Sequence, residues 1–170
     1  MNRKVEQAVT RLLQLEGASL PEFRDAITEE LCNITQSELS YFAALDLNEE
    51  TLTMIGWSRS AMGYCAVDDK PIVYMLEETG LWGDAVRERQ PVITNDYPGL
   101  RKPTKKGYPK GHVPVQNHMN LPIFDGDRIS VVVGVGNKRG DYTLDDARDI
   151  EDLMYEIWPT FLRVLQEATW

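Results

Sequence analysis

The sequence predicts an α+β domain in which an antiparallel sheet carries helices on one face and loops on the other. Three observations lead to this fold class. Two amphipathic helical patterns precede the first strand pattern, a strong hairpin signal lies at residues 121–135, and a further amphipathic helix follows that hairpin. The chain has 170 residues, which suits one domain with a hydrophobic core of its own.

Two helices are expected before any strand. Apolar residues recur at helical spacing in residues 5–13, and Gly17 follows as a C-terminal stop. Ser19 and Glu22 then form a capping-box pattern, which predicts the start of a second helix. That helix carries an apolar stripe as far as Ile34.

Short strands are expected through the middle of the chain. Residues 41–47 and 52–57 pair as a hairpin, and residues 72–75 form a short edge strand. Residues 80–89 have the pattern of a short helix, and residues 92–94 that of another strand.

A long loop precedes the strongest signal in the sequence. Residues 99–116 contain three prolines and three glycines, and a loop of that length in a compact domain is usually functional or mobile. Asp125-Gly126 then joins two apolar runs as a hairpin, because glycine tolerates the positive φ of a tight turn. The second run, residues 129–135, is apolar throughout except for one serine, which predicts a strand buried on both faces near the centre of the sheet.

A final helix is expected from about Thr143. Its apolar stripe continues past Pro159, and a proline inside a helix should kink it or divide it in two. The terminal helices are both amphipathic and longer than the sheet needs. We therefore expect them to pack together and against a second copy of the chain.

The composition excludes several functional classes. A net charge of −9 argues against nucleic acid as a partner. No apolar run approaches the roughly 20 residues that cross a bilayer, and no signal peptide is recognisable, so a cytoplasmic location is expected. Cys32 and Cys65 are far apart and lack metal-ligand spacing, which favours a reducing compartment. No metal or cofactor is expected.

Four ordered blocks of the sequence resemble a bacterial subfamily of GAF domains that occurs in sensor kinases and related signalling proteins. The resemblance covers about residues 20–162. Its blocks are Gly-Leu-Trp-Gly at 80–83, Pro-Val-Ile-Thr-Asn-Asp-Tyr at 91–97, Lys-Gly-Tyr-Pro-Lys-Gly-His-Val-Pro at 106–114 and a block from Leu-Pro at 121–122 to Gly-Val-Gly-Asn-Lys at 134–138. The resemblance implies a PAS- and profilin-like, six-stranded antiparallel sheet, with the terminal helices on one face and loops plus a short helix on the other.

The end of the last block is similar to the signature that closes GAF domains, Asn-Lys followed by an aromatic residue and an aspartate. The matching residues are Asn137, Lys138, Tyr142 and Asp146. In GAF domains of cyclic-nucleotide phosphodiesterases the lysine and aspartate form a salt bridge that supports the pocket. The resemblance therefore implies a tie between strand and helix. Ala147 replaces the acidic residue that usually follows, which weakens any cyclic-nucleotide hypothesis.

Nine side chains are candidates for a ligand pocket between the sheet and residues 95–116. The aromatic ones either pack in the core or line the pocket. The asparagine and aspartate after residue 94 either hold a turn or bind a polar ligand, and the histidines either bond loop backbone or act as pocket donors. The set is Tyr41, Trp57, Trp82, Asn95, Asp96, Tyr97, His112, His118 and Asn120.

The resemblance implies a regulatory domain that is not an enzyme. It would sense a small molecule and relay the signal through its terminal helices to an output domain, such as a histidine kinase or a cyclase, outside this chain. Residues 1–18 are treated as a linker or dimer helix, and residues 19–170 as the GAF domain with its signalling helix. A homodimer and a partner signalling protein are the expected partners.

Alternatives remain for the pocket. The domain is either a ligand sensor or a dimerisation and relay module with a vestigial pocket, and a third hypothesis is a thiol enzyme resembling free methionine-sulfoxide reductases. A covalent bilin is not expected, because neither Cys32 nor Cys65 precedes a histidine. The basic residues between 101 and 110 form either a solvated loop or a lid that attracts an anionic ligand.

Overall fold

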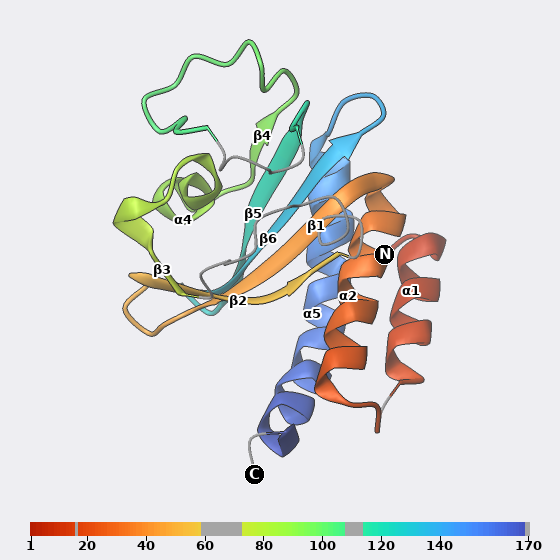
Figure 1. The fold of residues 1–170 in the computed structure, drawn as a ribbon. Coiled ribbons are helices and arrows are strands. Elements are labelled where there is room, and N and C mark those ends of the chain that lie inside the picture. Colours follow the sequence, from red (N-terminus) through yellow and green to blue (C-terminus); the bar gives the residue numbers. More distant parts are fainter. Residues whose placement is uncertain (16, 59–72, 108–113, 169–170) are drawn as a thin grey trace.

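A six-stranded antiparallel sheet forms the centre of the molecule, with three long helices on one face and a short helical segment on the other (Figure 1). The computed structural model describes residues 1–15, 17–58, 73–107 and 114–168. This arrangement confirms the α+β fold class predicted from the sequence.

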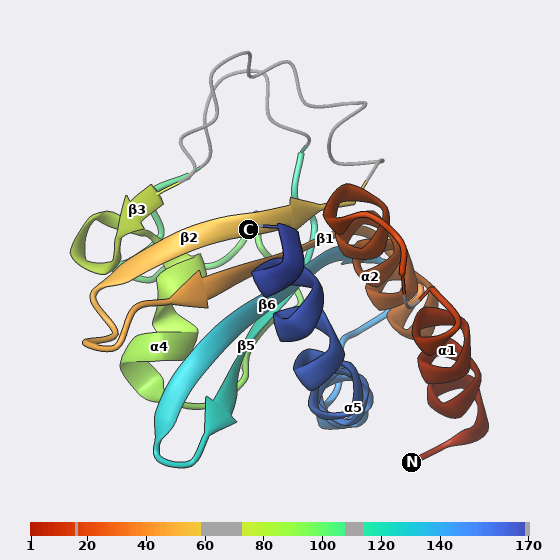
Figure 2. The same ribbon diagram turned by 90° about the horizontal axis from the view of Figure 1, so that it is seen from below.

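The helical layer consists of α1 (Arg3–Leu13), α2 (Leu20–Thr35) and α5 (Leu144–Ala168). Ser19 and Glu22 form the predicted capping box at the start of α2. All three helices lie on the same side of the sheet (Figure 2), and their buried apolar side chains merge with those of the sheet into one core. The terminal helices therefore pack together within a single chain, as expected.

The strand order is β3-β2-β1-β6-β5-β4, and every neighbouring pair is antiparallel. The central strand β6 lies between β1 and β5, and each of residues 129–136 is buried, as the continuous apolar run predicted. The strands are β1 (Ser37–Leu45), β2 (Thr51–Trp57), β3 (Val73–Met75), β4 (Val92–Thr94), β5 (His118–Asp125) and β6 (Arg128–Lys138).

The tight turn between β5 and β6 has the predicted form. Asp125 pairs with Arg128 across it, and Gly126 adopts a φ of +64°. Glycine reaches this left-handed region without steric cost, since it has no Cβ. The turn thus fixes the register of the hairpin that carries much of the site described below.

The opposite face of the sheet carries η1 (Leu76–Glu78), η2 (Leu81–Gly83) and α4 (Asp84–Glu88). Their apolar side chains pack on β1, β2 and β6 and form a second, smaller core. The short helix predicted over residues 80–89 corresponds to η2 and α4 together. Arg89, with a φ of +56°, ends it in the left-handed conformation.

The first strand differs from its prediction by several residues. It was expected at residues 41–47 but begins at Ser37 and ends at Leu45. Gln36 reverses the chain with a φ of +56°, so the strand starts directly after α2. Pairing with β6, in which Ser37 faces Lys138, then extends the strand toward its N-terminal end.

Of the two outcomes expected at Pro159, a kink or a division of the last helix, the structure has the kink. α5 continues through this proline for 25 residues, and Figure 2 shows its final turns leaning away from the direction of its first turns. Proline has no backbone N–H, so the carbonyl of Tyr155 loses its partner within the helix. Both Tyr155 and Pro159 lie on the exposed side of α5, where water can bind that carbonyl. Within the described residues, no helix has the length and apolar character needed to cross a membrane.

Candidate functional site

Polar and aromatic side chains gather on the loop-bearing face of the sheet, where β1, β6 and β5 lie side by side. Gly134 of β6 is paired with Tyr41 of β1 on one side and with Asn120 of β5 on the other. His118 points to the same face as Asn120, because side chains alternate along a strand. We call the group formed by Tyr41, Trp82, Tyr97, His118 and Asn120 the sheet-face site.

Gly134 makes room for the contact at the centre of the sheet-face site. A Cβ at this position would overlap the Tyr41 ring and approach Asn120 Oδ1 to 2.6 Å. Without it, the Tyr41 hydroxyl reaches across β6 and donates to Asn120 Oδ1 at 2.5 Å. A glycine late in this strand therefore allows its neighbours to approach closely.

The Asn120 amide links Tyr41 to His118 and fixes which ring nitrogen carries a proton. Burial raises the pKa of Tyr41 far above its ordinary value, so its hydroxyl stays protonated and donates to Asn120 Oδ1. The amide nitrogen of Asn120 then lies 3.0 Å from His118 Nδ1. Because an amide nitrogen only donates, Nδ1 is the acceptor and the proton of the neutral ring is on Nε2.

His118 Nε2 is buried and has no hydrogen-bond partner in the part of the chain that the structure describes. Burial lowers the pKa of His118 to about 4, with Asp84 raising it and Lys102 lowering it by smaller amounts. The ring is therefore neutral near pH 7. An unpaired buried donor costs roughly 1–3 kcal/mol, which indicates a position where a ligand atom would accept.

Aromatic rings gather around Tyr41 on the same face of the sheet. The Trp82 ring meets Tyr41 edge to face at 5.9 Å and Tyr74 at 5.0 Å between ring centroids. Trp57 faces Tyr41 in the register of β1 and β2 and packs against the same smaller core. These rings can present flat apolar surface to a ligand.

A buried carboxylate closes the neighbouring loop onto α4. Asp84 lies within 2.7 Å of Arg87 Nη1, 2.9 Å of Lys102 Nζ and 2.7 Å of Thr104 Oγ1. Burial alone would raise the pKa of Asp84, but hydrogen bonds from Thr104, Lys102 and Arg87 outweigh burial and lower it. Asp84 therefore stays ionised and clips residues 99–107, which we call the strap, to α4.

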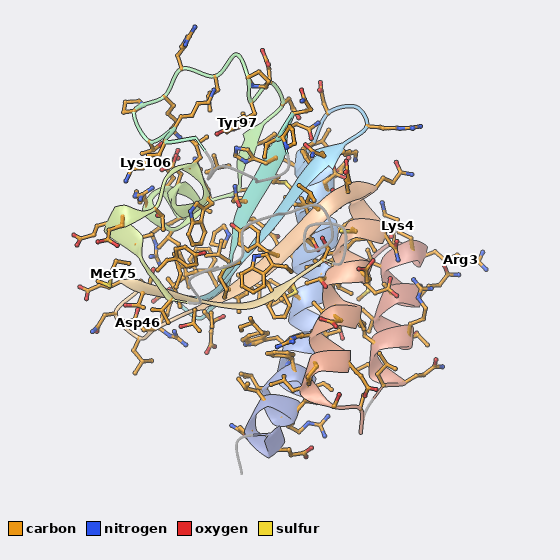
Figure 3. All side chains as sticks on the ribbon, viewed as in Figure 1. Arg3, Lys4, Asp46, Met75, Tyr97 and Lys106 are labelled. Carbon is orange, nitrogen blue, oxygen red and sulfur yellow. The ribbon has the colours of Figure 1, made fainter. Side chains whose placement is uncertain are left out.

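Lysines of the strap also bind protein groups. Lys105 Nζ donates to the carbonyl of Tyr97 at 2.7 Å and lies 4.5 Å from the centroid of its ring, and Lys106 Nζ donates to the carbonyl of Glu78 at 3.1 Å. Figure 3 shows Tyr97 at the end of β4 and Lys106 close to α4. The Tyr97 ring in turn lies 5.6 Å from that of His118. These lysines fasten the strap to neighbouring backbone, and Lys110 of the same basic loop lies outside the described residues.

The structure places Asn95 and Asp96 away from the sheet-face site. Asn95 Oδ1 accepts from the Tyr142 backbone N–H at 2.8 Å, and its Nδ2 donates to the Tyr142 carbonyl at 3.2 Å. Asp96 Oδ1 accepts from the Gly99 N–H at 3.1 Å and holds a turn. Their side chains thus bind backbone, and His112 lies outside the described residues.

The closing signature ties β6 to α5. Lys138 Nζ forms an ion pair with both oxygens of Asp146, at 2.8 and 2.9 Å, and Asp146 Oδ2 also accepts from the Thr143 N–H at 3.0 Å. Asn137 adopts a φ of +59°, and its Oδ1 accepts from the Gln116 N–H at 2.8 Å. The expected contact between Lys138 and Asp146 is present, together with an anchor for the segment that leads into β5.

Sequence reasoning missed the cluster around Asp84. Its cations lie in two separate segments, Arg87 in the same short helix and Lys102 in the strap, so only the folded chain brings them together. Tyr74, in a three-residue edge strand, also gave no pattern of its own. The available signal was the presence of acidic residues in a short helix, Asp84 and Glu88, ahead of a basic loop.

Other reactive groups lie elsewhere. Cys32 is buried in α2, in the helical layer, and burial raises the pKa of its thiol; Cys65 is outside the described residues. Among the residues that the structure describes, no three His, Cys, Asp or Glu side chains are grouped so that they could hold a metal ion. The sheet-face site thus offers hydrogen bonds and aromatic contact.

Sequence comparisons identify relatives over almost the whole chain. A family model described as a GAF domain matches residues 17–161. A curated protein of Methanosarcina acetivorans, named "Methyl sulfide methyltransferase-associated sensor", is 48% identical over 163 residues. The match covers 95% of this chain and 16% of that protein, so the chain spans about a sixth of the relative's length.

Solved structures share the same fold. The GAF domain of an Acinetobacter phosphoenolpyruvate-protein phosphotransferase matches with a TM-score of 0.71 and 14% identity, covering 98% of this chain and 97% of that one. A free methionine-R-sulfoxide reductase from Neisseria meningitidis matches with a TM-score of 0.66 and 11% identity, covering 98% and 95%. At these identities the likeness concerns the fold alone.

Proposed function

The chain belongs to the GAF domain family, and from that premise we propose that it is a non-catalytic sensory domain that binds a small molecule between the sheet and residues 95–116. The observation that carries this proposal is the buried Nε2–H of His118, an unpaired donor among the described residues, in a ring whose centroid lies 5.6 Å from that of Tyr97. The name of the 48% identical relative, a sensor, supports the same role.

The contacts around residues 138–142 support a relay from the sheet-face site to the helices. Asn117, next to His118 in β5, accepts from the Lys138 N–H and donates to the carbonyls of Lys138 and Gly140, each at 2.9 Å. Asn95, two residues before Tyr97, holds the same turn from the other side. A ligand that shifts β5 or the strap would therefore shift the turn that starts α5.

A second contact extends this relay to the other helices. The Tyr142 hydroxyl lies 2.6 Å from Ser37 Oγ, which lies 2.7 Å from Thr35 Oγ1 at the end of α2. We infer that α2 and α5 move together and act on an output domain outside this chain, such as a histidine kinase or a cyclase. The greater length of the Methanosarcina relative is consistent with a sensory domain inside a larger protein.

Dimerisation through the terminal helices and a cytoplasmic location complete the proposal. The apolar face of α1, formed by Val5, Ala8 and Leu12, is buried against the rest of the chain. A helix in residues 1–18 that links or dimerises would therefore use its outer face. The exposed side of α5 offers a second surface for the same contact.

Thermal denaturation against a metabolite library, with cyclic nucleotides and organic acids included, tests the sensing function. We expect at least one compound to raise the Tm of the wild type and to do so less in a His118→Phe variant. Tyr155→Phe, which changes an exposed ring on α5, is the matched control and should respond as the wild type does. If no compound raises the Tm, the relay module with a vestigial pocket replaces the sensor.

A thiol enzyme has less support, although structures of methionine-sulfoxide reductases share the fold. Cys32 lies in the helical layer, on the other face of the sheet from His118, and its raised pKa disfavours the thiolate. We expect a Cys32→Ser, Cys65→Ser double variant to differ in no way from the wild type in an assay of free methionine sulfoxide reduction. Activity that disappears in this variant would instead establish the enzyme.

A further inference from the structure

We propose that the ligand of the sheet-face site presents an oxygen acceptor, of a carbonyl or a carboxylate, to the Nε2–H group of His118, while a flat apolar part lies against the aromatic rings. This inference rests on the proposed sensing function and specifies the chemistry of its ligand.

The direction of each hydrogen bond around the histidine leads to this chemistry. Tyr41 donates to Asn120 Oδ1, which leaves the Asn120 amide nitrogen to donate to His118 Nδ1. A neutral imidazole has one proton, and it is therefore on Nε2. A protonated ring nitrogen has no free lone pair, so in this state Nε2 binds an acceptor and neither a donor nor a metal ion.

The hydrogen bonds that orient this donor are present without a ligand. Asn120 is buried, and both ends of its amide are engaged, Oδ1 by the Tyr41 hydroxyl and Nδ2 by His118 Nδ1. The donor at Nε2 is thus preorganised, which lowers the entropy lost on binding. It also lacks a partner within the described ranges, so an accepting ligand atom replaces no existing protein contact.

The surroundings of His118 favour an acceptor over a cation. The buried neutral ring presents an N–H donor toward the site. An ammonium group has only N–H donors of its own, so it cannot form a hydrogen bond there. Asp84 and Lys102 act on the pKa of His118 in opposite directions, and both effects are smaller than that of burial. An uncharged carbonyl needs only the hydrogen bond, whereas a carboxylate also requires compensation for its lost hydration.

The aromatic rings define the rest of the ligand. Trp82 stands edge-on to both Tyr41 and Tyr74, and Tyr97 contacts the His118 ring. Binding sites for small molecules generally combine apolar walls with a few fixed polar groups that orient the ligand. A planar or aliphatic body attached to the accepting oxygen matches both features.

Nuclear magnetic resonance of protein labelled with ¹⁵N-histidine tests the state of the donor. The chain has only two histidines, so the set of signals that disappears in a His118→Gln variant belongs to His118 and the set that remains belongs to His112. We expect His118 to show a protonated Nε2 and an unprotonated Nδ1 from pH 8 down to about pH 5. A proton on Nδ1, or a cationic ring at pH 7, would overturn the inference.

Three probes of nearly equal shape then test the ligand class. Benzamide presents a neutral oxygen acceptor, benzoate an anionic one, and benzylamine only donors. We expect benzamide or benzoate to shift the His118 Nε2 signal, with binding about tenfold weaker in His118→Phe, as expected for one lost hydrogen bond. His118→Gln, which keeps an N–H donor, should retain part of the affinity and guards against an effect of misfolding.

The two acceptor probes separate a neutral from an anionic ligand, and the remaining outcomes contradict the inference. Benzylamine binding as well as benzamide, or benzamide binding that is unchanged in His118→Phe, would show that Nε2–H does not choose the ligand. If neither acceptor probe binds while a library compound without an oxygen acceptor does, the inference fails and sensing stands. If nothing binds from either set, both fail.

Discussion

Tyr41 determines the protonation of a histidine two hydrogen bonds away. Sequence patterns identified Tyr41, Asn120 and His118 as candidates, but nothing in the sequence gives the direction of the bonds between them. That direction depends on β1 and β5 both flanking β6, so that Tyr41 and Asn120 meet over Gly134. A residue type can thus be predicted from the sequence, whereas its role here depends on register.

A Tyr41→Phe substitution tests this chain of hydrogen bonds. It leaves the buried Asn120 Oδ1 without its donor, so we expect the free energy of unfolding to fall by about 1–3 kcal/mol. Urea denaturation measures the change. Tyr155→Phe, at a ring that is 50% exposed, is the control; it removes only an exposed contact at 3.3 Å from the Phe124 N–H and should change stability by less than about 0.5 kcal/mol. Equal losses in the two variants would contradict the assignment.

The pH dependence of stability tests the burial of His118. In the unfolded chain this ring takes up a proton near pH 6.5, but in the folded chain only near pH 4. The unfolded state therefore binds more protons between these values, and stability falls as the pH drops through that window, by about 3 kcal/mol in total at about 1.4 kcal/mol per pKa unit.

The His118→Gln variant isolates this contribution. Carboxylates with lowered pKa values, such as that of Asp84, also make the fold less stable in acid, and they do so in both proteins. We therefore expect the variant to lose less stability than the wild type when urea denaturation is repeated between pH 7 and pH 4. Parallel losses would mean that His118 titrates normally in the folded state.

At the scale of elements, the two ends of the long loop have separate tasks. The strap is fastened to α4 through Asp84, while Asn95 and Asn117 hold the turn at residues 138–142. The sequence indicated that this loop matters, because of its length and its glycines and prolines. The sequence could not show whether the Asn95 side chain binds a ligand or the protein backbone, since the same amide group would make either contact.

An Asn95→Ala substitution tests the proposed relay at this turn. It removes both side-chain bonds to Tyr142, so we expect faster amide hydrogen exchange in the turn at residues 138–142 and in the first turn of α5. Asp96→Ala, one residue further on, removes only a local turn contact and serves as the matched control. If α5 exchanges equally fast in the two variants, Asn95 does not couple β4 to that helix.

At the scale of the whole molecule, the fold followed from hydrophobic patterning. The hairpin signal and the continuous apolar run predicted the sheet and its central strand, and helical spacing predicted both terminal helices. At Pro159 the sequence left two outcomes open, a kink or a division of the helix. The helix continues with a bend, because packing of Ile157 and Phe161 against the core holds both sides of the proline. Tertiary burial here outweighs the local cost of one lost hydrogen bond.

The outer side of α5 leads to a prediction about assembly. Tyr155, Trp158 and Leu162 follow at helical spacing and lie on one side of the helix, with Tyr155 50% and Leu162 39% exposed. A second copy packed along α5 would cover this stripe. The net charge of −9 on each chain opposes that contact, so association should strengthen with added salt.

Light scattering measures the outcome directly. We expect a mass near twice 19.4 kDa for the wild type at moderate salt. Leu162→Glu places a charge in the stripe and should give a monomer, because a buried unpaired carboxylate is costly. The control Leu47→Glu adds the same charge at an 80% exposed position in the turn between β1 and β2, and should remain dimeric. Both variants carry the same net charge, so a difference in mass between them reports the α5 contact alone. A wild type that stays monomeric at high concentration and high salt would mean that α5 signals without a partner copy.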